Sequence, residues 1–549
     1  MAVSSTFSPS AGTSAGALRL GGAMRSAALW RWAALLVLGA SVLAAAVGPW
    51  LQGAPVLPED DAEYYRVIAR HIAQSGVSTF DGLSLTNGYH PLWEAVLVLQ
   101  EKLVGSSFLV TRLIEAALVT CAFPLFLRAA GLRTALGAVG FLVLYGRLVA
   151  GLALTGMEVS ALVGMTGLTV WAAMPSRRPG APRGVLLGLA AAAAVLSRLD
   201  AAVFVAPLVA FAPLPRAVRG VALATAAAIG GVYAAYNLAT FGAVLPVSSA
   251  IKSLGGVQVN ARFLDQLASD WREHGPLGRY VQTFGLLALS PVFLLLSRRD
   301  SLGRALAGAA LVGGVLFTAK LVFGSSWRVW PWYNFPVLFA LLAAASTVGV
   351  RLEEAMARWA RLRSARLRST LSVAAPALGG LVLLALAAKA AVVVRRPEPP
   401  SLNRFDALNA RAAARWGPIL RGVPVAMGDR AGAFAAAYPG PVVQLEGLVN
   451  DKAWFDVVKR RGDVVPLLCA RGVRFVIAYR PELGAYREHR LPVMRRSLTQ
   501  FEAPAIPLAK ADELDHIADR TLLDLRGVDE GDDQLYLWRL SACGAPSAR

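Results

Sequence analysis

Pro58-Glu59-Asp60-Asp61-Ala62-Glu63-Tyr64-Tyr65 opens a polar island that follows the first long apolar segment of the chain. The island continues to Thr86-Asn87-Gly88-Tyr89-His90-Pro91-Leu92-Trp93, where apolar residues resume. Four acids fall within five residues, and carboxylates beside a bilayer are costly unless they are paired, hydrated or used. A compact acidic cluster with aromatic neighbours at a membrane face is therefore a candidate site.

The composition is that of a polytopic membrane protein. The chain has 549 residues, of which 56% are hydrophobic, and its mean hydropathy of +0.52 is too high for an ordinary soluble protein. The formal net charge is +20, but the arginines stand in short clusters between apolar runs, as cytoplasmic loops do. No basic face with interleaved aromatic residues occurs, so we expect no nucleic-acid binding.

Eleven apolar runs suit membrane-spanning helices, which need roughly 20 apolar residues each. They lie at 27–50, 107–127, 135–152, 155–174, 184–197, 200–213, 217–240, 281–297, 303–323, 331–350 and 370–394. The run 91–104 is short and contains Glu94, Glu101 and Lys102, so we expect an interfacial helix there. Residues 1–26 are rich in Ser, Ala and Gly and are predicted to form a disordered cytoplasmic tail.

The charges of the loops predict the orientation. If the N-terminus is cytoplasmic and 91–104 does not span the membrane, the arginine clusters lie in the cytoplasm, as the positive-inside rule favours. These clusters hold Arg128, Arg133, Arg177, Arg178, Arg183, Arg216, Arg219, Arg298, Arg299, Arg304, Arg351, Arg358, Arg361, Arg363, Arg366 and Arg368. The same orientation places five segments on the extracytoplasmic face: the outer loop 51–106, Gly156-Met157-Glu158, Ser197-Arg198-Leu199-Asp200, the loop 241–280 and Ser325-Ser326-Trp327-Arg328.

Residues 395–549 are more polar and are predicted to form a small extracytoplasmic α/β domain. Short β-like runs occur at 423–427, 442–445, 474–479 and 534–538, with helix-compatible stretches between them. Cys469 and Cys543 lie in this part and can pair if it is extracytoplasmic. Cys121 lies in an apolar run, where inert packing is expected. The predicted fold is therefore an α-helical polytopic membrane module, residues 27–394, followed by an α/β domain.

Asp60 and Asp61 allow two interpretations. One carboxylate can act as general base on an acceptor hydroxyl while its neighbour orients a substrate group, since adjacent side chains point to different sides. Alternatively, they are solvated loop acids that cap a helix beginning at Ala62. His90-Pro91-Leu92-Trp93 likewise offers an imidazole and an indole at the headgroup level, either for a site or as an interface anchor.

Other charged residues stand in or beside the apolar runs. Glu158, Arg198 and Asp200 either form a structural ion pair or line a polar cavity. Lys252 either holds a phosphate or is an ordinary loop lysine. Arg328, with aromatic neighbours, allows the same two interpretations, interfacial snorkelling being the simpler one. No Gly-rich phosphate loop, HExxH or paired CxxC motif occurs.

Taken in order, these segments resemble bacterial members of the GT-C superfamily. Those are membrane glycosyltransferases that use lipid-phosphate-linked sugars, and they are related to protein mannosyltransferases and to the aminoarabinose transferases of lipid A. The motifs are Asp-Asp-Ala-x-Tyr-Tyr, Phe-Asp-Gly, Thr-Asn-Gly-Tyr-His-Pro-Leu-Trp, Gly-Met-Glu, Ser-Arg-Leu-Asp, Tyr-Asn-x-x-x-Phe-Gly-x-x-x-Pro-x-Ser-x-x-x-Lys and Trp-x-Trp-Tyr. The resemblance covers roughly residues 27–350 and extends weakly to 428–432 and 445–451.

The resemblance implies a catalytic acid in the first outer loop, at Asp60 with Asp61 as its neighbour. It implies inverting transfer of a hexose or pentose from a polyprenyl-phosphate donor to a hydroxyl of a glycan, lipid or protein, outside the bacterial inner membrane. Glu63 departs from the pattern, which favours an aromatic or basic residue there. A divalent metal that bridges Asp60 or Asp61 to phosphate, as in the oligosaccharyltransferases of the superfamily, stays open but is not favoured, and no other cofactor is expected. The candidate substrate-binding residues are His90, Tyr64, Glu158, Arg198, Asp200, Lys252, Arg328 and Tyr333.

Two other classes of function are open. A transporter or flippase of lipid-linked glycan also uses broken helices and buried charges, but its sites lie near the bilayer midplane between repeated halves. The sequence has neither an internal repeat nor midplane charges. A non-catalytic scaffold would instead bind a cell-envelope partner through the outer domain.

Overall fold

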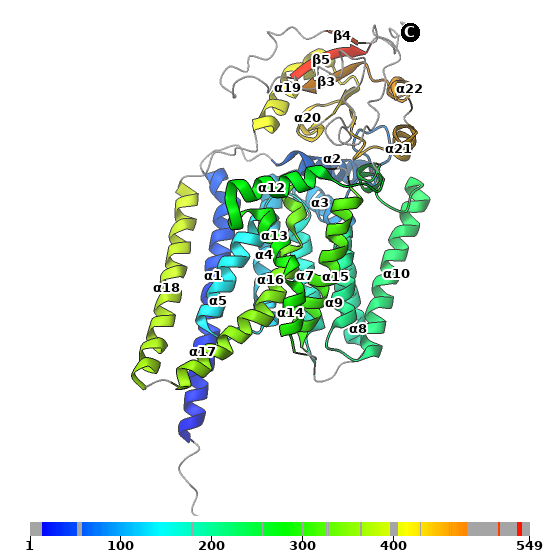
Figure 1. Cartoon of the computed structure of the whole chain (residues 1–549). Helices are drawn as coiled ribbons and strands as arrows, with labels where there is room; N and C mark the ends of the chain where they lie inside the picture. Colours follow the sequence, from blue (N-terminus) through cyan, green and yellow to red (C-terminus); the bar gives the residue numbers. More distant parts are fainter. Residues whose placement is uncertain are drawn as a thin grey trace, which may run out of the picture.

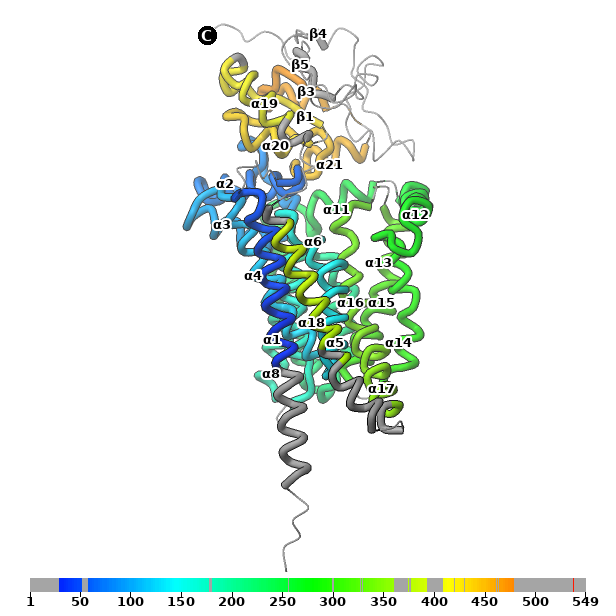
Figure 2. Tube along the Cα trace, turned by 90° about the vertical axis from the view of Figure 1, so that its left-hand side faces the viewer, coloured from blue at the N-terminus to red at the C-terminus, as the bar shows by residue number. Residues whose placement is uncertain are grey.

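The computed structural model describes residues 14–51, 58–479, 514–516 and 535–540, with gaps at 177–179, 255, 299–300, 326, 328, 363–364, 396–403, 429, 461 and 463. A long helical bundle carries a smaller domain of helices and strands on one of its ends (Figure 1). In the view turned by 90°, the same domain lies over that end, and residues 60–104 lie between the two parts (Figure 2).

Each of the eleven predicted runs contains a helix of the bundle. The helices along the bundle are α1 (Ser14–Leu51), α4 (Phe108–Ala130), α5 (Ala135–Tyr145), α7 (Val159–Ala173), α8 (Ala181–Ser197), α9 (Ala202–Phe211), α10 (Arg216–Phe241), α13 (Arg279–Ala288), α14 (Ser290–Leu296), α15 (Leu302–Phe323), α16 (Val337–Ala344) and α18 (Ala365–Arg395). Shorter elements complete them: η1 (Gly146–Ala150) and α6 (Gly151–Ala153) follow α5, η2 (Leu199–Ala201) joins α8 to α9, and η5 (Ala345–Gly349) joins α16 to α17 (Val350–Leu362).

Six of the described helical segments are long and apolar enough to cross a membrane, or seven if α13 and α14, bent by 44° relative to each other, form one span. Val159–Ala173, Ala181–Ser197, Leu199–Phe211 and Ala377–Val392 are also apolar but shorter. The chain is therefore a multi-pass membrane protein, while the number of eleven spans stays a prediction.

The connections alternate between the two ends of the bundle (Figure 1). We call the smaller domain of helices and strands the outer domain. The polar island and the segments before α7 and after α8 lie at the end of the bundle that carries it. Described arginines stand in or beside the connections at the opposite end, between α4 and α5, α9 and α10, α14 and α15, and α16 and α17: Arg128, Arg133, Arg216, Arg219, Arg298, Arg304 and Arg351. These arginines therefore lie at the end opposite the polar island, while the assignment of that end to the cytoplasm stays a prediction.

The helices α2 (Asp60–Ser75) and α3 (Pro91–Val104) lie at the bundle end, below the outer domain (Figures 1 and 2). The predicted interfacial helix at 91–104 is α3. The helix α2 begins at Asp60 rather than Ala62, and acids in a first turn suit the positive end of the helix dipole. Also at this end are α11 (Val247–Lys252), α12 (Ala261–His274), η3 (Gly275–Leu277) and η4 (Pro331–Asn334).

The first helix differs from the prediction. It begins at Ser14, so residues 14–26 are helical where the sequence predicts a disordered tail. The reason is composition, because Ala, Leu and Arg are strong helix formers and no proline occurs between residues 14 and 48. Residues 1–13 lie outside the described residues.

The outer domain has a five-stranded sheet in the order β2-β1-β3-β5-β4. Its strands β2, β1 and β3 are parallel, while β5 runs antiparallel to β3 and β4. The predicted runs contain β1 (Val425–Met427), β2 (Val442–Gln444), β3 (Phe475–Tyr479) and β5 (Leu535–Leu540), while β4 (Leu514–His516) is too short and polar to stand out in the sequence. The helices of this domain are α19 (Arg404–Leu420), α20 (Ala431–Ala437), α21 (Lys452–Lys459) and α22 (Val465–Ala470).

The outer domain shares a hydrophobic core with α2. Tyr64 and Ile68 of α2 pack in one cluster with Trp416 and Phe434 of the outer domain. Gly432 makes the approach possible, because a Cβ there would lie 2.4 Å from the backbone oxygen of Asp60. The polar island and the outer domain are therefore one packed unit above the end of the bundle.

Candidate active site

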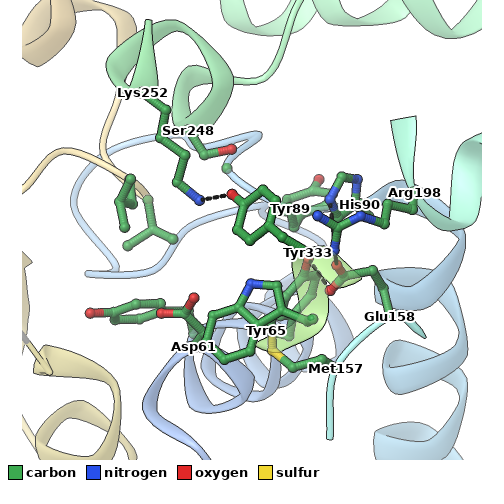
Figure 3. Close-up of a pocket in the computed structure, with 15 residues that line it drawn as sticks. Asp61, Tyr65, Tyr89, His90, Met157, Glu158, Arg198, Ser248, Lys252 and Tyr333 are labelled. Carbon is green, nitrogen blue, oxygen red and sulfur yellow. Dashed lines mark hydrogen bonds and ion pairs between the residues drawn. The ribbon is translucent and has the colours of Figure 1, made fainter. Parts of the chain in front are cut away.

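A cavity lies where the bundle end, the polar island and the outer domain meet. Residues far apart in the chain line it: Asp61, Tyr64, Tyr65, Gly88, Tyr89, His90, Met157, Glu158, Arg198, Ser248, Lys252, Trp332, Tyr333, Leu448 and Val449. Figure 3 shows Lys252 of α11 and Asp61 of α2 facing the cavity from different elements, with Glu158 and Arg198 farther along it. The convergence of these charges makes the cavity the candidate active site.

Lys252 is a half-buried cation that lines the cavity. Its Nζ donates a hydrogen bond to the Tyr333 hydroxyl at 3.1 Å, and among the described residues no carboxylate lies within ion-pair distance of it. Burial acts to lower the pKa of Lys252, but the Tyr333 oxygen and the Asp61 carboxylate outweigh burial and raise it. Lys252 is therefore charged at neutral pH and available to an anionic ligand.

Arg198 forms a buried charge network directly after α8. Its Nη1 donates to Glu158 Oε1 at 2.5 Å, and its Nε donates to Asp200 Oδ1 at 2.8 Å. The guanidinium also lies 4.8 Å from the ring centroid of Tyr333, which suits a cation–π contact. Since the Arg198 side chain is only 2% exposed, its two carboxylate partners are what make this buried charge tolerable.

Two further groups hold Glu158 from the side of the polar island. Tyr65 donates its hydroxyl to Glu158 Oε2 at 3.1 Å. His90 accepts a hydrogen bond from the Leu199 N–H at Nδ1, at 3.3 Å, and its Nε2 lies 3.7 Å from Glu158 Oε1. Burial lowers the pKa of His90 to about 4, with Glu158 acting in the opposite direction. His90 is thus neutral at pH 7, and the contact at Nδ1 assigns its proton to Nε2, facing Glu158.

Gly156 is clamped from both sides, which fixes the backbone that leads to Glu158. Its N–H donates to Glu115 Oε1 at 2.7 Å, and its carbonyl accepts from Trp93 Nε1 at 3.0 Å. Its φ of 84° is in the left-handed region, and a Cβ would lie 2.9 Å from Ala62 Cβ. Glu115 was not singled out from the sequence, although one acid inside the apolar run 107–127 is a signal of such a role.

Replacing Glu115 by Leu should lower the thermal stability of the protein. The change leaves the buried Gly156 N–H without its acceptor, which costs roughly 1–3 kcal/mol. Glu115→Gln keeps an acceptor oxygen and should stay close to the wild type. Unfolding temperatures in detergent would check this, and equal temperatures for Glu115→Leu and the wild type would contradict the role of the clamp.

Asp60 and Glu63 have surroundings that differ from that of Asp61. Asp60 accepts a hydrogen bond from the Ala433 N–H of the outer domain at 3.1 Å, and it is not among the residues that line the cavity. Glu63 is buried and pairs with Arg66 at 2.7 Å. Burial raises the pKa of Glu63, with Arg66 opposing the rise. The acid that departs from the family pattern is therefore half of an ion pair within α2.

Most of the sequence candidates meet in the cavity. Asp61, Tyr64, His90, Glu158, Arg198, Lys252 and Tyr333 line it. Asp200 lies behind Arg198 and is also 3.7 Å from Lys320 Nζ. Arg328 lies outside the described residues. Sequence reasoning missed the contribution of the outer domain, Leu448 and Val449, because only the fold brings that segment here. In the described part of the chain, no group of three His, Cys, Asp or Glu is arranged to hold a metal.

No protein-family model and no curated protein matches the sequence. Solved structures are similar in fold. The archaeal oligosaccharyltransferase AglB from Archaeoglobus fulgidus, in complex with an inhibitory peptide and a dolichol-phosphate, aligns with a TM-score of 0.50 at 13% identity, over 84% of this chain and 70% of its own. ArnT from Cupriavidus metallidurans bound to undecaprenyl phosphate aligns with a TM-score of 0.47 at 15% identity, over 94% and 99%. The arabinofuranosyltransferase AftD from Mycobacteria gives 0.42 at 13% identity, over 93% and 40%.

The likeness to AglB extends over most of both chains. It agrees with the motifs of the polar island and the loops, with the alternating helices and with the domain above the charged end. At an identity of 13%, the likeness supports a similar fold and not a shared function. This chain has the fold of the GT-C membrane glycosyltransferases.

Proposed function

We propose that this protein is a glycosyltransferase that moves a sugar from a polyprenyl-phosphate donor to an acceptor hydroxyl. The observation that carries the proposal is the presence of a carboxylate, Asp61, and a cation, Lys252, on different elements around one cavity. Group transfer from a phosphate needs both, a base for the entering hydroxyl and positive charge for the leaving phosphate.

In the proposed reaction, the acceptor oxygen attacks the anomeric carbon while Asp61 removes the hydroxyl proton. The bond between the anomeric carbon and the phosphate oxygen breaks, and its electron pair leaves with the polyprenyl phosphate. Lys252 and the Tyr333 hydroxyl, which are hydrogen-bonded to each other, stabilise the negative charge that develops on the phosphate. The leaving phosphate is a weak base, so no protein acid is required. Displacement in line implies inversion at the anomeric carbon.

Asp61 replaces Asp60 as the proposed base. The resemblance to the superfamily implies Asp60, but Asp60 Oδ1 accepts from a backbone N–H of the outer domain, whereas Asp61 lines the cavity with Lys252. A general base has to reach the proton that it removes, so geometry takes precedence over sequence position. Asp60 would then hold the outer domain against α2 through its hydrogen bond with the Ala433 N–H.

A lipid-linked donor is supported by the fold and by the place of the charges. The AglB structure, with a TM-score of 0.50, holds a dolichol-phosphate. In the present chain, α11, whose last residue is Lys252, lies at the end of the bundle rather than at its middle (Figure 2), and Arg198 lines the same cavity as Lys252. A transporter would place its site near the bilayer midplane, so the position of the charges favours the enzyme.

We infer that the cavity and the outer domain face the extracytoplasmic side of a bacterial inner membrane. The described arginine clusters lie at the opposite end of the bundle, where the positive-inside rule expects the cytoplasm. Cys469 of the outer domain is disulfide-bonded, which suits an oxidising compartment. Cys543, its possible partner in the sequence, lies outside the described residues.

Cysteine labelling should report this orientation. In a Cys121→Ser background, Ser253→Cys next to α11 should react with a membrane-impermeant maleimide in intact cells. Ala357→Cys in α17, at the opposite end, should react only after the membrane is permeabilised. Both positions are exposed in the structure, so access depends on the side of the membrane. The reverse pattern would refute the orientation.

The function itself is tested with the purified protein in lipid nanodiscs. Undecaprenyl-phosphate-linked mannose, glucose, galactose, arabinose and N-acetylglucosamine are supplied one at a time, and release of undecaprenyl phosphate is measured. At least one donor should be consumed. Movement of a donor across a bilayer without cleavage would indicate the transporter, and a protein that neither cleaves nor moves any donor would indicate the scaffold.

A further inference from the structure

The helix α11, which ends at Lys252, has no capping side chain of its own. The residue before it is Pro246, which makes no side-chain hydrogen bond to the first turn, and the first N–H groups of any helix have no acceptor within the helix. The Val247 N–H donates instead to Asn87 Oδ1 of the polar island at 2.9 Å, in a buried contact across 160 residues of the chain. Asn87, which is 4% exposed, therefore does for α11 what an N-cap residue does for an ordinary helix.

The apolar side of α11 packs on the outer domain. Ile251, the neighbour of Lys252 in the chain, is fully buried and belongs to one cluster with Leu448 and Trp454. The loop after β2 approaches this side chain closely, because a Cβ on Gly447 would lie 2.9 Å from Ile251 Cδ1. The helix is thus held along its side as well as at its start, and Lys252 reaches the cavity from a fixed backbone.

The loop that carries Asn87 is itself fixed to α2. An isolated β-bridge closes this loop at Thr79, and the buried Asp81 side chain accepts hydrogen bonds from two backbone N–H groups of the loop, each at 2.8 Å. The Thr79 carbonyl accepts from His71 Nδ1 of α2 at 2.8 Å. Because α2 also carries Asp61, a continuous set of contacts joins the helix of the carboxylate to the helix of the cation.

Two further side chains near Asn87 bind the backbone of other segments beside the cavity. His90 accepts from the Leu199 N–H at 3.3 Å, and Trp93 donates to the Gly156 carbonyl at 3.0 Å. Of these three side chains, Asn87 is the one that bonds to α11. It is therefore the contact through which the polar island can set the place of the cation on that helix.

We propose that Asn87 is a positioning residue, which holds the start of α11 so that Lys252 keeps its place in the cavity. The inference rests on the proposed function, in which Lys252 stabilises the leaving phosphate while Asp61 takes the acceptor proton. A charge that is already in place stabilises a transition state without reorganisation. Losing the bond to Asn87 would let α11 shift, and Lys252 would then no longer be held where the phosphate leaves.

The first experiment measures donor cleavage by variants of Asn87. Full-length protein in nanodiscs receives the undecaprenyl-phosphate sugar that the wild type consumes best, and kcat and KM are determined from the release of undecaprenyl phosphate. Asn87→Leu offers no acceptor to the Val247 N–H and should lower kcat by up to about 10²-fold, the cost of misplacing a group by about 1 Å. Asn87→Asp keeps an acceptor oxygen and should recover most of the rate. It loses no existing bond, since Asn87 Nδ2 has no hydrogen-bond partner in the described structure.

A double-mutant cycle separates positioning from general damage to the fold. In a Lys252→Met background, Asn87→Leu should have little further effect on kcat, because the cation that it would misplace is already gone. Ser301→Ala is the control, because it removes a cap from α15, where Ser301 Oγ accepts from the Arg304 N–H at 3.3 Å, at the opposite end of the bundle. This control should leave kcat unchanged in both backgrounds. If Asn87→Leu does not fold, Asn87→Ala takes its place in the same cycle.

Three results would each overturn the positioning role while the glycosyltransferase stands. They are a wild-type kcat in the variant without the acceptor, an equal loss of kcat with and without Lys252, and an Asn87→Asp variant as slow as Asn87→Leu. A wild type that consumes no donor would instead overturn the proposed function, and the role of Asn87 with it.

Discussion

Asp61→Asn reduces the rate of sugar transfer by about 10²–10⁴-fold, the range that a positioned general base contributes. The asparagine keeps the shape of the side chain but cannot take the proton of the acceptor hydroxyl. The loss should fall on kcat rather than on the KM of the donor, because Lys252 and Tyr333, which the proposal assigns to the phosphate, are unchanged. Initial rates at saturating donor, followed by release of undecaprenyl phosphate, measure the effect.

Asp60→Asn is the matched variant one residue earlier. Its amide oxygen can still accept the Ala433 N–H, so the contact between α2 and the outer domain survives. Most of the activity should therefore remain. The opposite result, an inactive Asp60→Asn beside an active Asp61→Asn, would return the role of base to Asp60. Binding of undecaprenyl phosphate by both variants shows that any loss of rate is not a loss of the folded site.

The ambiguity between these two residues shows where sequence reasoning ends. Neighbours on an α-helix point about 100° apart, so only one of them faces a given cavity. The choice depends on what packs against the start of α2. Here that contact is made by Gly432 and Ala433, the latter 373 residues after Asp60 in the chain. No local pattern contains that information.

The parts of the fold that could be predicted are those set by the bilayer itself. Apolar length predicts the helices, and the described chain has a helix in each of the eleven runs. The described arginines of the predicted cytoplasmic clusters lie at the end opposite the polar island, while the orientation itself stays a prediction. The predicted orientation of the helices already put Glu158, Arg198 and Lys252 on one face of the membrane. Contacts with the outer domain were not predicted, because Leu448 and Val449 reach the cavity only through the packing of the outer domain on α2.

Lys252→Met should lower kcat by about 10²–10³-fold, the loss typical of removing one preorganised group that stabilises charge in a transition state. Lys252→Arg keeps the charge and should recover a large part of the rate. Lys252 touches Tyr333 but no carboxylate in the described structure, so neither change leaves a buried acid unpaired. Unfolding temperatures should therefore stay near that of the wild type, and only the rate of transfer should change.

Arg198→Leu provides the contrast that separates a functional cation from a structural one. Arg198 is bonded to both Glu158 and Asp200, and removing one partner of a buried ion pair typically costs about 3–5 kcal/mol. This variant should lose stability and activity together, whereas Lys252→Met loses activity alone. If Lys252→Met instead lowered the unfolding temperature as much as Arg198→Leu, its charge would serve the packing of the bundle end. Lys252 would then no longer support the proposal that the cavity binds a phosphate.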